Sequence, residues 1–531
     1  MNFNFSNHYL NKNFQKISFQ DLIIFLIPFT IFMFYLYIYD PGILRPDTFS
    51  QFHQIATSKF DNWHPFFHTF IDMLCLKVWS NPKSIAILQI LIFSTIWAII
   101  CNYFRQDIKN NNMRIFIFQV IFTLIISLIP INGIFSVMIL KDILFSYFLL
   151  FSCFLIYVLL DKKANVSFTF VIIFSLSMAF VAQIRPNGIY LIVILLIFLS
   201  IYLYKKDKLK NLYILIPALT IIFILLIASL NIVYDVEDNQ KDAVMTKVIH
   251  MLADYDLNLD LSNGDRDKIH KLFNRSVIEH NYDITFSDPI YNVANKKVYD
   301  NDKSTYISMA IKYSLNNPFY FLKYIFGSSP MVWNIVRGDD WSGSAYRTDT
   351  DASRDFFIEK RDLSGLSDFE SAPTVNKGTK TYNQVDSFVN YIQKNKLLDT
   401  LFNSPALYMY LSFILIGAIF LLTKSKNIFL VYLPNMLNIL IIFASTPIQD
   451  VRYLYPNLLL FYFLVIILLG ILVKSKLDDK SSFRGHDNFS DDLVKSKLDD
   501  KSSFREQKKN SSKKIDSLID TYTLKKFEDE E

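Results

Sequence analysis

Cysteine and glycine are scarce in this chain of 531 residues, which has 3 cysteines and 12 glycines. The cysteines, Cys75, Cys101 and Cys153, all fall in or beside apolar segments. The sequence therefore does not predict a disulfide-stapled exported domain. Net charge is also low, at +5, and basic residues of short loops account for most of it, so nucleic acid is not indicated as a partner.

Hydrophobic residues, by contrast, make up 52% of the chain and are gathered into long blocks. Blocks of roughly 16 to 22 apolar residues can cross the hydrocarbon core of a bilayer as helices. The first block is longer than the apolar core of a signal peptide, which favours a retained helix. The sequence therefore predicts an all-α polytopic membrane protein with about ten transmembrane helices. The predicted spans are Leu22–Tyr39, Ile85–Ile100, Ile115–Ile129, Ile143–Leu160, Phe168–Val181, Ile189–Tyr204, Leu212–Leu230, Leu407–Leu422, Ile428–Phe443 and Asn457–Val473.

Basic residues set the expected orientation, because Lys and Arg favour the cytoplasmic side of a membrane. Five basic clusters fall on one side if the N-terminus is cytoplasmic. We therefore expect a multi-pass protein of a bacterial cell membrane with both termini inside. The clusters are Lys12/Lys16, Arg105/Lys109/Arg114, Lys162/Lys163, Lys205/Lys206/Lys208/Lys210 and Lys424/Lys426.

This topology divides the chain into five parts. They are a cytoplasmic N-terminus (1–21), a membrane core (22–230) with a first exterior loop (40–83), an α-rich extracytoplasmic domain between helices 7 and 8 (231–404), three last spans (405–473) and a tail (474–531). The tail repeats LVKSKLDDKSSFR at 472–484 and 493–505, which indicates a disordered duplication. Within the exterior domain, the apolar run Pro318–Val336 fits a core or interface helix, with a re-entrant segment as the alternative.

Four cations run against the inside bias, because Arg45, Lys141, Arg185 and Arg452 are all expected on the outer face. Charges near membrane depth are costly and usually serve a function. A bound anion such as phosphate explains them, since guanidinium groups bind it through two hydrogen bonds. The alternative is that each side chain reaches lipid headgroups on its own.

Asp47 lies in the first exterior loop, just beyond the first span. A carboxylate there can take a proton from a hydroxyl group, or hold a divalent cation with a phosphate. The alternative is an N-cap, since Pro46-Asp47-Thr48 is typical of a helix start. Spacing does not separate the two.

Two histidines of the same loop, His64 and His68, are four residues apart and could ligate zinc. The pattern lacks the glutamate of HExxH, and Pro65 makes His64 a helix-boundary residue. A polar contact from His64 to substrate is favoured over a metal site.

Together, the exterior Asp47 and the Trp63-His64-Pro65 element resemble membrane glycosyltransferases of the GT-C superfamily, which use polyprenyl-phosphate sugars. The Leu140–Phe145 element, the Arg185-Pro-Asn-Gly188 turn and the late Arg452-Tyr453 are similar to elements of a less characterised bacterial branch. The resemblance covers roughly residues 20–230 and 405–473. It implies a GT-C-like fold and transfer of a sugar from a polyprenyl-phosphate donor to an envelope glycan or lipid acceptor, with inversion.

The resemblance also implies roles for seven residues. Asp47 is expected to be the catalytic base, and the substrate-binding residues are expected to be His64, Lys141, Asp142, Arg185, Asn187 and Arg452. Among these, Arg185 first, and after it Lys141 and Arg452, are expected to hold the departing phosphate. Asp142 is a candidate second acidic residue, with Mg²⁺ or Mn²⁺ as candidate cofactor. Because Asp47 has no acidic neighbour, metal dependence stays open.

Two other functional classes share this pattern. A polysaccharide polymerase or ligase acting on polyprenyl-linked glycans also needs a basic outer face, but Asp47 would be dispensable. A lipid or glycan transporter needs charged or broken helices at mid-membrane, where the sequence has few ionisable residues. A non-enzymatic envelope scaffold is favoured only if all the outer cations can be mutated without loss of function.

Overall fold

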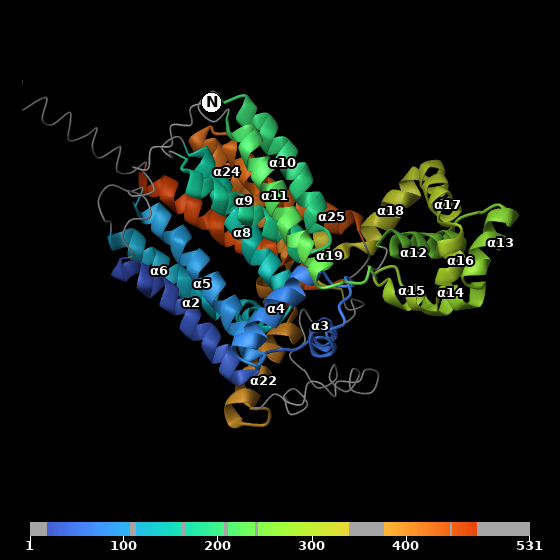
Figure 1. Ribbon diagram of the computed structural model, residues 1–531, viewed down its shortest axis with the longest axis horizontal. Helices are drawn as coiled ribbons and strands as arrows, with labels where there is room; N and C mark the ends of the chain where they lie inside the picture. Colours follow the sequence, from blue (N-terminus) through green and yellow to red (C-terminus); the bar gives the residue numbers. More distant parts are fainter. Residues whose placement is uncertain are drawn as a thin grey trace, which may run out of the picture. The chain divides into compact units, whose positions relative to one another are not determined.

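The computed structural model describes residues 18–106, 113–161, 166–206, 211–238, 243–338, 376–445 and 449–474. Every regular element among them is helical (Figure 1). The chain forms two compact units, Met1–Leu468 and Leu469–Glu531. The second is described only at residues 469–474, so the predicted tail with its duplicated segment lies outside the described residues, as do residues 1–17 of the N-terminus.

Helices occur at all ten segments where the sequence predicts a span. They are α2 (Phe19–Ile38), α5 (Lys83–Gln106), α6 (Met113–Leu128), α8 (Lys141–Leu160), α9 (Phe168–Ile184), α10 (Gly188–Tyr204), α11 (Leu212–Val233), α24 (Pro405–Thr423), α25 (Asn427–Ala444) and a last helix, Val451–Lys474, that opens with the 3-10 turn η2 (Val451–Leu454).

Seven of these helices are long and apolar enough to cross a membrane, counting only the described residues. An eighth span results if α6 and α7 (Pro130–Val137), which meet at a bend of 69°, are taken together. The apolar helices α9 and α10 have 17 residues each and fall short of that length. The protein is therefore all-helical with seven to eight candidate spans, and the count of ten remains a prediction.

Helix α8 is the most enclosed of the candidate spans, because 83% of its apolar window is buried inside the protein. It packs against α5, α9 and α25, and side chains such as Tyr147 and Phe154 are fully covered. Helix α11 is the opposite case, with 17% of its window buried. An apolar helix with so little protein contact is suited to a lipid environment.

The segment after α2, which the sequence predicts to be the first exterior loop, is held to the start of α8 by backbone hydrogen bonds. The Ile43 amide donates to the Val137 carbonyl (2.9 Å), and the Ile139 amide donates to the Ile43 carbonyl (3.1 Å). Gly42 precedes this contact with φ +124°, a conformation that only glycine adopts readily. The Thr48 hydroxyl adds a bond to the Ile139 carbonyl (2.6 Å). These bonds therefore hold residues 42–48 at a fixed distance from the start of α8, although the two segments are far apart in sequence.

Two short helices follow in the exterior loop, α3 (Pro46–Thr57) and α4 (Phe66–Val78). Helix α3 is amphipathic: Phe49 and Phe52 pack with Leu76 and Ile139 in a small apolar cluster. Burying these rings stabilises the orientation of α3, and so of the polar residues at its first turn.

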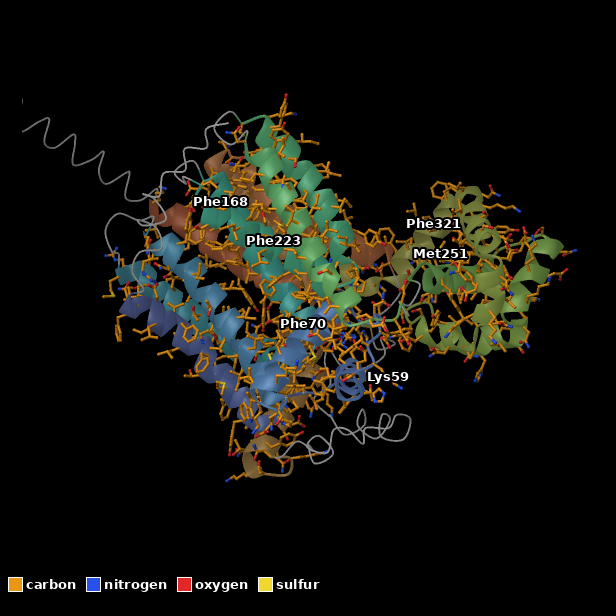
Figure 2. All side chains as sticks on the ribbon, in the orientation of Figure 1. Lys59, Phe70, Phe168, Phe223, Met251 and Phe321 are labelled. Atoms are coloured by element: carbon orange, nitrogen blue, oxygen red, sulfur yellow. The ribbon has the colours of Figure 1, made fainter. Side chains whose placement is uncertain are left out.

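The segment 231–404, which the sequence assigns to an extracytoplasmic domain, is made of helices in its described residues. Its helices are α12 (Ala243–Asn258), α13 (Asn263–Leu272), α14 (Arg275–Asn281), α15 (Asp288–Val293), α16 (Lys296–Asn301), α17 (Lys303–Asn316), α18 (Pro318–Ser328), α19 (Pro330–Trp333), α22 (Lys380–Lys394) and α23 (Lys396–Asn403). Helices α12 to α18 enclose a core that includes Leu252, Tyr255 and Tyr299. Figure 2 labels Met251, which belongs to this core, and Phe321, which packs against it.

The apolar run Pro318–Val336 forms α18 and α19, neither of which reaches the length of a membrane span. Instead, α19 packs against α24 and α25, and Phe326 of α18 stacks edge-on against Phe443 of α25 at 5.1 Å between ring centroids. The Gln449 side-chain amide donates to the carbonyls of Ser328 (3.0 Å) and Thr285 (3.3 Å). These contacts support the interface-helix interpretation.

The tight turn between α9 and α10 generates a prediction for Gly188→Ala. The Gly188 amide donates to the Arg185 carbonyl (2.9 Å), and a Cβ atom at position 188 would collide with the Val181 carbonyl. Backbone atoms cannot yield as a flexible side chain can, so we expect a loss of about 1–3 kcal/mol in unfolding free energy. The measurement is the thermal unfolding midpoint in detergent.

Gly264→Ala is the matched control, because nothing lies within 4 Å of a Cβ added there. An alanine in α13 is expected to leave the midpoint unchanged or slightly raised. Equal midpoints for the two variants would contradict the packing argument.

Candidate functional site

The site is built on the first turn of α3, where Pro46 occupies the first helical position and Arg45 is the N-cap residue. The Arg45 amide donates to the Thr48 hydroxyl (3.1 Å), so this end of the helix is closed without a carboxylate. Asp47 is therefore not the N-cap residue, and the capping alternative does not describe its position. Its side chain is 23% exposed and points to the start of α8.

Lys141, the first residue of α8, makes the closest contact with Asp47. Its Nζ donates to Asp47 Oδ2 at 2.8 Å and lies 3.1 Å from His64 Nδ1. An ammonium group only donates, so His64 Nδ1 accepts and the ring proton lies on Nε2. His64 Nε2 in turn lies 3.9 Å from Asp47 Oδ1. Asp47, Lys141 and His64 therefore each lie next to the other two.

Arg452, in the turn that begins the last helix, connects this group to a second one. Its Nη1 lies 3.6 Å from Asp47 Oδ2, and its Nε lies 3.6 Å from Asp142 Oδ2 and 2.9 Å from Asp450 Oδ2. Asp450 also accepts from the Arg452 amide (3.2 Å), which fixes the turn. One guanidinium group therefore contacts three carboxylates.

Arg185 lies behind Arg452, at the end of α9. Its Nε pairs with Asp142 Oδ1 at 3.1 Å, and its guanidinium carbon lies 4.5 Å from the centre of the Tyr453 ring. The same ring lies 5.0 Å from the guanidinium carbon of Arg452, so Tyr453 separates two cations. Arg185 is 5% exposed and Asp142 is fully buried.

Two layers therefore make up the site. Asp47, Lys141 and Arg452 are 23%, 10% and 14% exposed and form an outer layer, while Asp142 and Arg185 form a buried inner layer. Six of the predicted residues meet here from four segments of the chain: Asp47, His64, Lys141, Asp142, Arg185 and Arg452. Sequence reasoning did not single out Asp450, although it lies in the turn that was predicted to be outside, and it gave Tyr453 no role beyond the resemblance of Arg452-Tyr453.

Asn187 does not join this group. It is the N-cap residue of α10 and makes no side-chain capping bond, and no hydrogen bond or ion pair among the described residues links it to the site. The structure therefore gives no support to Asn187 as a substrate-binding residue, although it lies only two residues from Arg185.

The charges within the site balance, since Lys141, Arg185 and Arg452 face Asp47, Asp142 and Asp450. An external anion such as phosphate was one explanation for the outer cations. In the structure each of these three has a carboxylate of the chain beside it, and binding of an external anion stays a prediction. Asp142 contacts two arginines, Arg185 and Arg452, and its role as a second acidic residue stays a prediction.

Electrostatics fix the protonation states of the outer layer. Burial alone would raise the pKa of Asp47. The positive charges of Lys141 and, to a smaller extent, Arg452 lower it by more than burial raises it, so the pKa lies well below its usual range. Burial, reinforced by Lys141, lowers the pKa of His64 to about 3. At neutral pH Asp47 is a carboxylate and His64 is a neutral ring.

His68 is separated from His64 in spite of the four-residue spacing. His68 Nδ1 lies 3.3 Å from Asp72 Oδ2 and 3.0 Å from Gln51 Nε2, in a buried polar cluster between α3 and α4. His64 precedes α4, whose N-cap is Pro65, so the two rings do not share a helix face. Among the described residues, no group of three or more His, Cys, Asp or Glu side chains is placed to hold a metal ion.

A cavity of about 580 Å³ lies farther along α3. Its wall is formed by residues of α3 and α4 and by the end of α11, and none of the charged side chains above lines it. The lining residues are Ile55, Ser58, Phe60, Met73, Leu76, Lys77, Val233, Tyr234 and Asp235.

Comparisons with protein-family models, with curated proteins and with solved structures find no match for this chain.

His64 generates a prediction about acid stability. The pKa of His64 is about 3 in the folded protein, below the usual 6.5. As pH falls, this histidine therefore binds a proton in the unfolded chain at a higher pH than in the folded protein. Its contribution to stability is fully present above pH 6.5 and is lost as pH falls toward 3. At pH 5 we expect this single group to cost about 2 kcal/mol of unfolding free energy. His64→Gln should therefore lose less stability between pH 7 and pH 5 than wild type.

The measurement is the unfolding midpoint of both proteins at the two pH values. His280→Gln, which changes an exposed histidine, is the control and should behave as wild type. Identical pH dependence in wild type and His64→Gln would show that this ring is not held neutral.

The Asp47–Lys141 pair generates a second prediction. Asp47→Asn and Lys141→Met should each lower the unfolding free energy, because each leaves a partly buried charge without its partner. The double variant should lose less than the sum, with a coupling of about 0.5–3 kcal/mol. Asp61→Asn combined with Lys141→Met is the control and should be additive, since Asp61 bonds to Gln54. Additive losses at Asp47 and Lys141 would contradict the pairing.

Proposed function

We propose that this chain is an integral-membrane glycosyltransferase that moves a sugar from a polyprenyl-phosphate donor to an envelope glycan or lipid acceptor, on the extracytoplasmic face of a bacterial cell membrane. The observation that carries the proposal is the outer layer of the site. There a partly exposed carboxylate, Asp47, lies within 2.8 Å of Lys141 and 3.6 Å of Arg452. A base and two phosphate-binding cations are the groups that such a transfer needs at one place.

The ion pairs give the proposed reaction an order of events. While Lys141 and Arg452 contact Asp47, its low pKa makes it a weak base. A donor phosphate attracts the same two cations, and the pKa of Asp47 rises as they turn toward the phosphate. Binding of donor thus prepares the base, so a hydroxyl group is not deprotonated before donor is present.

In the transfer step, the acceptor hydroxyl loses its proton to Asp47 while its oxygen forms a bond to the anomeric carbon of the sugar. The bond from that carbon to the phosphate oxygen breaks on the opposite face, so the configuration inverts. Lys141 and Arg452 stabilise the negative charge that appears on the departing lipid phosphate, where fixed cations contribute most. His64, with a neutral ring, accepts a hydrogen bond from Lys141 and holds it in place.

Arg185 receives a different role from the one first expected. It is 5% exposed and paired with Asp142, so in this proposal it positions Arg452 and Tyr453 instead of touching the phosphate. Asp142 likewise holds both arginines. The proposed partners are the donor, the acceptor and the surrounding lipids. No step of the proposed reaction uses a metal ion. Mg²⁺ or Mn²⁺ remains a candidate cofactor, which chelation in the assay below tests.

The prediction that tests the proposal concerns Asp47→Asn, which keeps the shape of the side chain but removes its ability to take a proton. Purified protein in nanodiscs is given a pool of radiolabelled polyprenyl-phosphate sugars and envelope glycan. Wild type is expected to transfer label, and Asp47→Asn is expected to lose at least about 100-fold in rate, the usual contribution of a general base. Labelled donor should still bind the variant.

Asp61→Asn is the matched control, because it makes the same chemical change in the same exterior loop, away from Lys141 and Arg452. It should retain transfer. Full activity of Asp47→Asn would reject Asp47 as base and favour a polymerase or ligase. Absence of any donor consumption by wild type, together with movement of labelled lipid across the bilayer, would favour a transporter.

A further inference from the structure

An exposed apolar stripe runs along one edge of the extracytoplasmic domain, on α17 and α18. Phe319 is 87% exposed and Leu315 is 74% exposed, values that are unusual for large apolar side chains in a water-facing domain. The whole stripe consists of Ile311, Leu315, Phe319, Leu322 and Phe326.

The spacing of these residues shows that they share helix faces and are not scattered over the surface. Ile311 and Leu315 are four residues apart on α17, and Phe319, Leu322 and Phe326 follow at intervals of three and four on α18. Residues at such intervals share one side of a helix. Other apolar residues of the same helices, such as Met309 and Tyr324, face the core of the domain. The domain core is therefore complete without the stripe.

The stripe continues into the surface of the candidate membrane spans. Phe326, its last member, packs against Phe443 of α25, and its carbonyl accepts from Trp333 Nε1 at 2.9 Å. The Trp333 carbonyl accepts from the Tyr410 hydroxyl of α24, also at 2.9 Å. Tyr410 is itself exposed on the surface of its span. These contacts connect the stripe, through Phe326 and Trp333, to helices α24 and α25 of the candidate spans.

We propose that the α17–α18 edge of the extracytoplasmic domain lies in the headgroup and upper acyl region of the outer leaflet, with the stripe as its lipid-facing side. An amphipathic edge of this kind binds a membrane surface through its buried apolar area. Trp333 and Tyr410 are the aromatic types enriched at that depth. Lys323, exposed on α18, can reach lipid phosphates from there. The inference is independent of the proposed glycosyl transfer.

The test uses the full chain in nanodiscs of phosphatidylethanolamine and phosphatidylglycerol. Nitroxide labels are placed by Phe319→Cys and Leu322→Cys in a background in which Cys75, Cys101 and Cys153 are replaced by alanine. Accessibility to oxygen, which enriches in lipid, is compared with accessibility to a water-soluble nickel chelate. Lys297→Cys, on an exposed position of α16, is the matched control.

The expected result is that oxygen reaches the labels at positions 319 and 322 better than the nickel chelate does, with the reverse at position 297. Nickel accessibility at 319 equal to that at 297 would overturn the proposal. Short label-to-label distances between copies would also overturn it, since the stripe would then be covered by a second copy of this chain.

A second measurement needs no cysteine replacement. It tests the lipid contact of the stripe even if the cysteine-free background does not fold. Hydroxyl-radical footprinting of the wild-type protein in the same nanodiscs compares each residue with its own unfolded reference. Phe319 and Leu322 should be protected despite their exposure, while the exposed Val293 of α15 should be oxidised readily. Oxidation of all three to the same extent would reject the lipid contact.

Discussion

Charge compensation at the outer end of an apolar bundle is the constraint on which this structure depends. A buried charge in such surroundings is stable only beside an opposite charge, and the inner pair Arg185–Asp142 meets that condition with at most 5% of either side chain exposed. Arg452 then contacts Asp142, Asp450 and Asp47 at once. The ends of α8, α9 and the last helix are thereby held in register by ion pairs.

The backbone contributes as much as the side chains to this arrangement. Hydrogen bonds between Ile43 and the segment 137–139 fix the distance from the predicted first exterior loop to α8 independently of the Asp47–Lys141 contact. Thr48 adds a side-chain bond to the same segment. The outer layer of the site is therefore positioned by main-chain geometry, and substitution of one charged side chain need not displace the others.

Much of the architecture could be predicted from sequence, because a bilayer makes simple demands. Apolar blocks long enough to cross it had to be helices, and the basic loops predict that Asp47, Lys141, Arg185 and Arg452 share one side. These four residues do converge. Their partners could not be predicted, because hydropathy carries no information on which direction a side chain takes at a helix end. Asp142 follows Lys141 directly, yet the two contact different groups.

The order in which the site is synthesised gives its charge balance a consequence for biogenesis. Asp47, Lys141, Asp142 and Arg185 emerge first and already sum to zero. Arg452 arrives more than 260 residues after Arg185, and it arrives with Asp450, its own counter-charge. From Arg185 onward, a nascent chain waiting in the membrane therefore carries balanced site charges. Arg452, the outer cation that completes the site, is delivered only when helix Val451–Lys474 inserts, so the site is assembled late in synthesis.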